Sequence, residues 1–203
     1  MMNTNVDALI SSTLNALQKF HASSSTDDAA AVNERLSALV RVTSTVDPTA
    51  RLSMKNPNLM EVLSYCPSLL SATTTSSMTR SRLHLLLFNL SFYNVNLRRY
   101  LAGEKAQLCG PVLECLKLSL KEQLGPQNLI DILRLLQVLT YESCLCLGCW
   151  ASDLISFLLS EICRPEEPEW MPYCMAILCN LATKSKSVCQ RIKKSVRIHM
   201  TFF

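Results

Sequence analysis

One apolar helical pattern occurs three times along the chain, and it restricts the fold to an array of repeated helices. The three copies are anchored at Leu90, Leu139 and Leu181, which lie 49 and 42 residues apart. Apolar residues precede each anchor by seven, four and three positions, which is the spacing of one helix face. The match continues into the following helix, at plus seven and plus eleven from each anchor, with Leu97, Cys146 and Val188, then Leu101, Trp150 and Ile192.

The composition and the length of the repeat favour packed helices. Apolar residues make up 49% of the 203 residues and glycine occurs only four times, which does not suit turn-dense β structure. A period of roughly 40–47 residues is typical of HEAT and armadillo arrays. Three helices in one unit, at 80–93, 95–102 and 109–120, favour the armadillo type. We therefore predict an all-α, armadillo-like right-handed α-solenoid of about four repeats.

We expect residues 1–203 to form the N-terminal part of a single helical repeat domain. Residues 1–79 are expected to form a weaker capping and first-repeat region, and residues 80–195 the clear repeats. Residues 196–203 are predicted to be a truncated or unstructured end, because a natural array end needs a polar cap.

The N-terminal region should begin with an amphipathic helix over 6–20 that caps the array. Ser25 and Asp28 resemble a capping box that opens the next helix. The following segment is divided by Pro48, Pro57 and Pro67. Since each proline disfavours helix at the residue before it, we predict short helices between them and a loop over 71–79. Beyond the first unit, further helices are expected at 127–141, 143–149, 151–163 and 170–183, with a successor from about Ser185.

A cluster of cysteines admits two interpretations. Cys144, Cys146 and Cys149, with Cys163 further on, could supply thiolates to a zinc ion. The spacing lacks a second ligand pair, however, and Cys146 and Cys149 coincide with helical positions that the other repeats fill with Leu97 and Tyr100, or with Val188 and Arg191, so we favour core packing and predict no metal. The same apolar window, Cys144–Cys163, is interpreted as a buried helix pair and not as a membrane span, because it carries acidic and serine residues.

No pattern of catalytic residues is recognisable in the sequence. His21, His84 and His199 do not stand in a familiar arrangement with a nucleophile, and no glycine-rich phosphate loop or paired-carboxylate signature occurs. We therefore predict that the protein is not an enzyme and needs no cofactor. The N-terminus shows no secretory signal, so we expect an intracellular, cytoplasmic protein with reduced thiols.

Two sets of polar residues are candidates for binding a partner. Asn89 and Asn180 each interrupt an apolar stripe just before an anchor leucine, where an amide could bind the main chain of a partner or a neighbouring loop. Val138 stands at the equivalent position between them. The second set is basic and lies near the C-terminal end, where it could form a binding patch or a solvated helix face: Lys184, Lys186, Arg191, Lys193 and Lys194. The overall charge of +4 makes nucleic-acid binding by the whole chain a weak alternative.

Three blocks of sequence resemble a known family. Leu90-Ser91 and Asn180-Leu181-Ala182 look like the phrase that ends the third helix of armadillo repeats. The blocks at 135–141, 153–159 and 171–181 are similar, in order and spacing, to the N-terminal armadillo region of the cancerous inhibitor of protein phosphatase 2A family. The similarity is clearest over 130–195 and elsewhere rests on hydrophobic pattern and length.

The resemblance implies a non-catalytic scaffold that inhibits protein phosphatase 2A by binding its regulatory subunit. It also implies a role in mitotic genome maintenance with a BRCT-repeat, topoisomerase-binding scaffold, and hence a location that extends to the nucleus or to mitotic chromosomes. Full-length members are expected to form homodimers, which this shorter chain is not expected to do. The alternative is a generic armadillo adaptor, or a chromatin-associated module that uses its basic C-terminal end.

Overall fold

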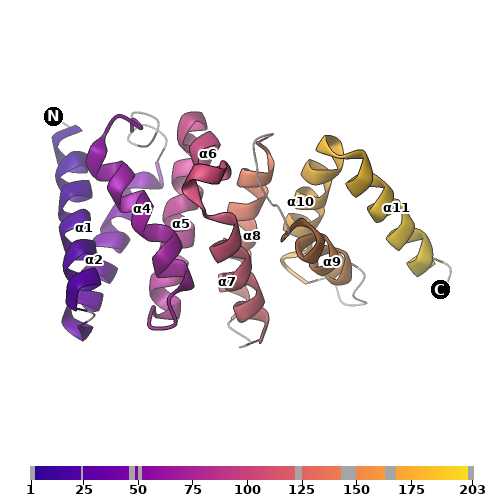
Figure 1. Cartoon of the computed structure of the whole chain (residues 1–203), viewed down its shortest axis with the longest axis horizontal. Helices are drawn as coiled ribbons and strands as arrows, with labels where there is room; N and C mark the ends of the chain where they lie inside the picture. The colour runs from indigo at the N-terminus through magenta and orange to yellow at the C-terminus, as the bar shows by residue number, and fades with distance from the viewer. Residues whose placement is uncertain are drawn as a thin grey trace.

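The computed structural model describes residues 3–23, 25–45, 49, 52–121, 125–142, 150–162 and 168–200. Every regular element within these residues is a helix, namely ten α-helices and one short 3-10 helix. The helices follow one another along an elongated array, with the N-terminus and the C-terminus at opposite ends (Figure 1). The predicted all-α solenoid is confirmed.

The first part of the array contains α1 (Asn3–Ser23), α2 (Thr26–Thr43), α4 (Pro57–Ser71) and α5 (Ser77–Tyr93). Ser25 caps α2 as predicted, since its Oγ accepts a hydrogen bond from the Asp28 N–H at 3.1 Å. The prediction of short helices between the prolines is wrong for α4, which spans 15 residues with Pro67 inside it. Pro67 lies one turn from the C-terminal end, and the Ala72 N–H still closes the helix by donating to the Ser68 carbonyl at 2.9 Å.

The remaining helices match the predicted positions closely. The predicted helix at 143–149 lies outside the described residues. The last helix runs to Met200, so the backbone of 196–200 is helical. The elements are α6 (Val95–Ala102), η1 (Glu104–Ala106), α7 (Cys109–Lys121), α8 (Pro126–Thr140), α9 (Trp150–Ile162), α10 (Met171–Lys184) and α11 (Lys186–Met200).

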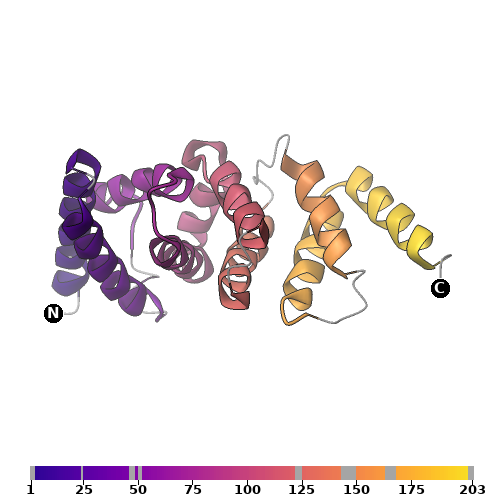
Figure 2. The same cartoon turned by 90° about the horizontal axis from the view of Figure 1, so that it is seen from below.

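The long helices form two layers. In one layer, α1 contacts α4, α4 contacts α7 and α7 contacts α9. In the other layer, α2 contacts α5, α5 contacts α8 and α8 contacts α10. Each repeat therefore contributes one helix to each layer, and the turned view shows these pairs side by side along the array (Figure 2). The array of α1–α10 contains four such pairs, and α11 continues it by packing on α10 and α9.

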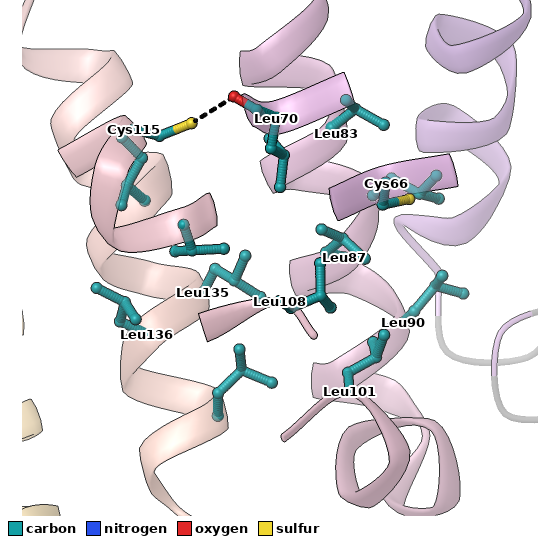
Figure 3. Packing of buried hydrophobic residues seen from close by; sticks show 14 of the residues in the cluster. Cys66, Leu70, Leu83, Leu87, Leu90, Leu101, Leu108, Cys115, Leu135 and Leu136 are labelled. Carbon is teal, nitrogen blue, oxygen red and sulfur yellow. Dashed lines mark hydrogen bonds between the residues drawn. The ribbon is translucent and has the colours of Figure 1, made fainter. Parts of the chain in front are cut away.

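The core runs continuously between the two layers. Leucines dominate it, and the anchors Leu90 and Leu139 are fully buried while Leu181 is 7% exposed. Each buried leucine side chain stabilises the fold by roughly 1.5–3 kcal/mol relative to an exposed one. Figure 3 shows leucines of α5 and α8 meeting in this core, beside Cys115, whose Sγ donates a hydrogen bond to the Leu70 carbonyl at 3.4 Å.

Candidate binding groove

A groove crosses one layer of the array, between α5, α8 and α10. Its volume is about 470 Å³. Four aromatic rings and two guanidinium groups line it, together with two amides and one valine, and no acidic side chain is among the described lining residues. The lining residues are Phe88, Phe92, Arg98, Arg134, Gln137, Val138, Tyr141, Tyr173 and Asn180.

The repeat places these side chains on a common helix face. The positions two before and two after an anchor leucine are four residues apart, and the position five before the anchor is three residues earlier still. Residues spaced by three or four lie on one face of a helix. On α8 these positions are Arg134, Gln137 and Tyr141, and on α5 the two flanking positions are Phe88 and Phe92. The sequence interpretation concentrated on the apolar stripe and missed this second face. The signal in the sequence was weak, because an aromatic residue stands two positions after only two of the anchors, as Phe92 and Tyr141, and an arginine stands five positions before only one of them, as Arg134.

Arg98 is held at one end of the groove by several contacts. Its Nε donates to Glu142 Oε1 at 2.6 Å, and both side chains are mostly buried, at 16% and 10% exposure. A terminal nitrogen of Arg98 donates to the Ser91 carbonyl at 3.4 Å, near the end of α5. The guanidinium also lies 5.5 Å from the centre of the Tyr141 ring, within the range of a cation–π interaction. Arg98 therefore ties the end of α8 to α5 and α6, and its charge is balanced by Glu142.

Arg134 lies in the middle of the groove and has different surroundings. Its Nε donates to the Tyr173 hydroxyl at 3.1 Å, and its guanidinium lies 5.5 Å from the centre of that ring. No carboxylate of the described residues lies within 4 Å of it, since none of the ion pairs found there includes Arg134. Arg134 therefore brings a positive charge into the groove without a direct acidic neighbour.

Asp131 lies one turn before Arg134 on the same helix, but it faces the interior. Burial raises the pKa of the Asp131 carboxyl, although hydrogen bonds from Gln127 at 2.7 Å and Ser81 at 3.2 Å and the charge of Arg134 oppose the rise. Asp131 is only 2% exposed, so it is not available to a ligand in the groove.

The aromatic wall of the groove is partly open to solvent. Phe88 and Phe92 stack with their ring centres 5.3 Å apart, and Phe92 is 54% exposed. Tyr141 is 67% exposed on the opposite side. Large rings that remain exposed beside an arginine are typical of the residues that dominate protein–protein contacts.

The two predicted asparagines bind neighbouring helices of this chain. The side-chain amide of Asn89 donates to the Val40 carbonyl at 3.2 Å and to the Thr43 hydroxyl at 3.3 Å, at the C-terminal end of α2. Asn180 makes the same pair of bonds two interfaces later, to the Gln137 carbonyl at 3.0 Å and to Thr140 Oγ1 at 3.2 Å. Both amides therefore connect adjacent helices of one layer. Asn89 is buried there, whereas Asn180 is half-buried and also lines the groove.

The predicted basic residues lie on α10 and α11, and Lys184 is close to Asn180. Lys184 ends α10, where its Nζ donates to the Thr140 carbonyl beside Asn180. Arg191 lies on α11 and donates to the Ser156 hydroxyl of α9 at 3.3 Å. The other predicted residues have exposed side chains on α11, which leads away from α10 in Figure 1: Lys186 at its start, then Lys193 and Lys194.

The cysteine cluster weighed as a zinc site cannot be placed, because Cys144, Cys146, Cys149 and Cys163 lie outside the described residues. Within the residues that the structure does describe, no group of three or more histidine, cysteine, aspartate or glutamate side chains could hold a metal ion. None of the helices described is long and apolar enough to cross a membrane.

The fold defines an armadillo-like helical-repeat protein with a groove along one layer. The family model described as "CIP2A, N-terminal" matches residues 2–202, which is nearly the whole chain, and indicates no enzyme domain. The chain belongs to this family, as the three sequence blocks predicted. No curated protein matches it. No solved structure matches it either.

Proposed function

We propose that the protein is a non-catalytic scaffold that restrains protein phosphatase 2A by binding its regulatory subunit through the groove between α5, α8 and α10. The name of the family supports an inhibitor of this phosphatase. The observation that carries the role of the groove is that the exposed rings of Phe92 and Tyr141 line the same groove as Arg134, which has no carboxylate within 4 Å among the described residues. A solenoid surface of this kind suits an extended partner segment.

The surroundings of the described histidines support a binding role over a catalytic one. His84 is 3% exposed, and burial lowers its pKa to about 3, so that the ring is neutral and enclosed at physiological pH. His21 packs edge-on against Tyr65, with ring centres 5.6 Å apart. Neither ring lies in the groove, where a general base would be needed.

A second candidate function uses the basic helix α11. The side chains of Lys186, Lys193 and Lys194 are exposed, and they could meet an acidic surface of chromatin or of a chromatin-bound protein. Such a contact would serve the role in mitotic genome maintenance, with a BRCT-repeat, topoisomerase-binding scaffold, that the family resemblance implies. On this proposal the protein is cytoplasmic and reaches the nucleus or the chromosomes during mitosis.

Surface plasmon resonance with a purified regulatory subunit tests the main proposal. We expect saturable binding by the 203-residue chain and a loss of about tenfold or more for Arg134→Gln or Tyr173→Ala, because both groups belong to the aromatic and basic centre of the groove. The exposed Arg35 on α2 provides the matched control, Arg35→Gln. Unchanged binding by both groove variants would remove the groove from the proposal.

Charge reversal on α11 separates the two candidates. If the groove is the site, Lys193→Glu with Lys194→Glu should leave the affinity for the regulatory subunit almost unchanged. If the basic helix is the site, the double variant should bind the regulatory subunit more weakly than the original chain, with the largest difference at low salt, and the groove variants should bind it with unchanged affinity.

A further inference from the structure

We propose that the groove recognises an extended peptide in which one acidic side chain stands next to an aromatic or large aliphatic one, and that Arg134 pairs with the acidic group. This inference rests on the proposed function, because it defines the chemistry of the segment that the groove would take. It does not depend on which protein carries that segment.

The hydrogen-bonding capacity of Arg134 supports an acidic ligand. A guanidinium has five N–H donors in a planar fork, and only the Nε donor of Arg134 is used, by the Tyr173 hydroxyl. The two terminal nitrogens make no hydrogen bond within the described part of the chain and belong to a residue that lines the groove. A carboxylate is the group whose geometry matches two parallel N–H donors. Contact with the Tyr173 ring also restricts the guanidinium before any ligand arrives.

The other arginine of the groove limits the expected number of acidic residues. Arg98 already pairs with Glu142 at 2.6 Å, and Glu142 Oε2 also lies 3.5 Å from Arg99. A second ligand carboxylate at that end would approach Glu142, and two carboxylates in contact repel each other. The groove should therefore prefer one acidic residue opposite Arg134 over a strongly acidic tract.

The aromatic rings define the rest of the ligand. Phe88 and Phe92 form a stacked wall on α5, and Tyr141 and Tyr173 stand on the α8 and α10 sides. Val138 adds an apolar contribution from α8. An apolar ligand side chain placed among these groups would remove exposed ring surface from water at a favourable free energy. Because the arginine lies between the rings, the acidic and apolar side chains must be close in the ligand sequence.

Amide groups in the groove suit a peptide main chain. The side-chain amide of Gln137 makes no hydrogen bond to any described residue and lines the groove. The NH₂ group of Asn180 is committed to α8, but its carbonyl oxygen remains able to accept a main-chain N–H. An extended peptide offers such N–H and C=O groups at regular intervals. A single-stranded nucleic acid fits less well, because it needs cations along its whole phosphate backbone, whereas the groove has one cation without an acidic partner.

Peptide selection followed by a binding cycle tests the proposal. Random twelve-residue peptides displayed on phage are selected on the intact 203-residue chain, and selected peptides are measured by fluorescence polarisation. We expect enrichment of one aspartate or glutamate beside phenylalanine, tryptophan, leucine or isoleucine. Replacing that acid by its amide should weaken binding about tenfold or more, and Arg134→Gln should do the same, because each removes one half of a charge-assisted pair.

The combination of both changes gives the decisive result. If the acid pairs with Arg134, the affinity measured with both substitutions together should be no lower than the affinity measured with either substitution alone. The control Arg35→Gln should bind like the original chain, and circular dichroism should show the same helicity for all variants. Arg134→Lys keeps the charge but loses the fork, so we expect part of the affinity to remain.

Several results would overturn the inference. These are a selection that yields no peptides, peptides without an acidic residue such as proline-rich ones, additive losses in the cycle, and stronger binding of an oligothymidylate with a steep salt dependence. The failure of the proposed partner is a separate result. If selected peptides behave as expected while the regulatory subunit of protein phosphatase 2A does not bind, the chemistry of the groove is correct and the partner is a different protein.

Discussion

Replacing Val138 by asparagine should stabilise the protein, because it would complete a series of amides that the repeat leaves interrupted. Asn89 and Asn180 stand one position before their anchor leucines and bind the end of the preceding helix in the layer. Val138 occupies the same position in α8 and cannot make such bonds. The residue that it would serve on α5 is Ser91, which corresponds to Thr43 and Thr140 in the neighbouring interfaces.

The structure shows the cost of this interruption. Ser91 is fully buried, and its hydroxyl has no hydrogen-bond partner in the part of the chain that is described. An amide at 138 with the geometry of Asn180 would donate to the Ser91 hydroxyl and to the Phe88 carbonyl. Each hydrogen bond contributes about 1 kcal/mol, and relief of the unpaired hydroxyl adds to this. Loss of the half-buried valine surface offsets part of the gain, so we expect a net stabilisation of about 1 kcal/mol.

Urea denaturation of the original chain and three variants, followed by circular dichroism, tests this expectation. Val138→Asn should raise the transition midpoint, and the reverse exchange Asn180→Val should lower it by the equivalent of about 1–2 kcal/mol, because it removes two bonds. Val138→Thr is the control, since its shape is that of valine but its hydroxyl cannot replace both amide donors. A lower midpoint for Val138→Asn than for the original chain would refute the reasoning.

Three further predictions concern the interior and the ends of the helices. The pKa of His84 is about 3 in the folded protein, below the ordinary value near 6.5. The contribution of His84 to stability should therefore be complete above pH 6.5, and the free energy of unfolding should fall by up to about 1.4 kcal/mol per pH unit as the pH drops towards 3. Thermal melting of His84→Phe should show a flatter pH dependence of stability if His84 is the cause. Removing one member of the buried Arg98–Glu142 pair should cost about 3 kcal/mol, and a double-mutant cycle should show a coupling above 0.5 kcal/mol. Iodoacetamide should label the exposed Cys179 long before Cys66, because Cys66 is enclosed and burial raises the pKa of its thiol to about 12. Mass spectrometry after timed quenching measures the order of labelling.

The sequence was sufficient to predict the described helices from α5 onward, because the pattern of buried apolar residues recurs around each anchor leucine. Leu90, Leu139 and Leu181 identified three helices of one layer, and all three residues are buried. The cap at Ser25 could be predicted for a local reason, since its partner is only three residues away. Pro67 was misjudged because a proline near the end of a helix disturbs few hydrogen bonds, and the sequence did not show where α4 would end.

The groove could not be predicted in the same way. Its residues come from four helices, and whether Arg134 meets Tyr173 or an acidic residue depends on the packing of α10 against α8. The role of the asparagines also depends on packing. Asn89 and Asn180 can bond either to a ligand or to a neighbouring helix, and only the positions of Val40 and Gln137 decide between these alternatives.

The position of Val138 connects stability with binding. It interrupts the series of amides at the same place where it forms part of the groove, and the buried hydroxyl of Ser91 has no hydrogen-bond partner among the described residues. If a polar amide stood at 138, the groove would lose an apolar surface between Gln137 and Tyr141. Val138→Asn should therefore melt at a higher temperature and yet bind the selected peptides more weakly. Tighter peptide binding by this more stable variant would show that the valine has no role in the groove.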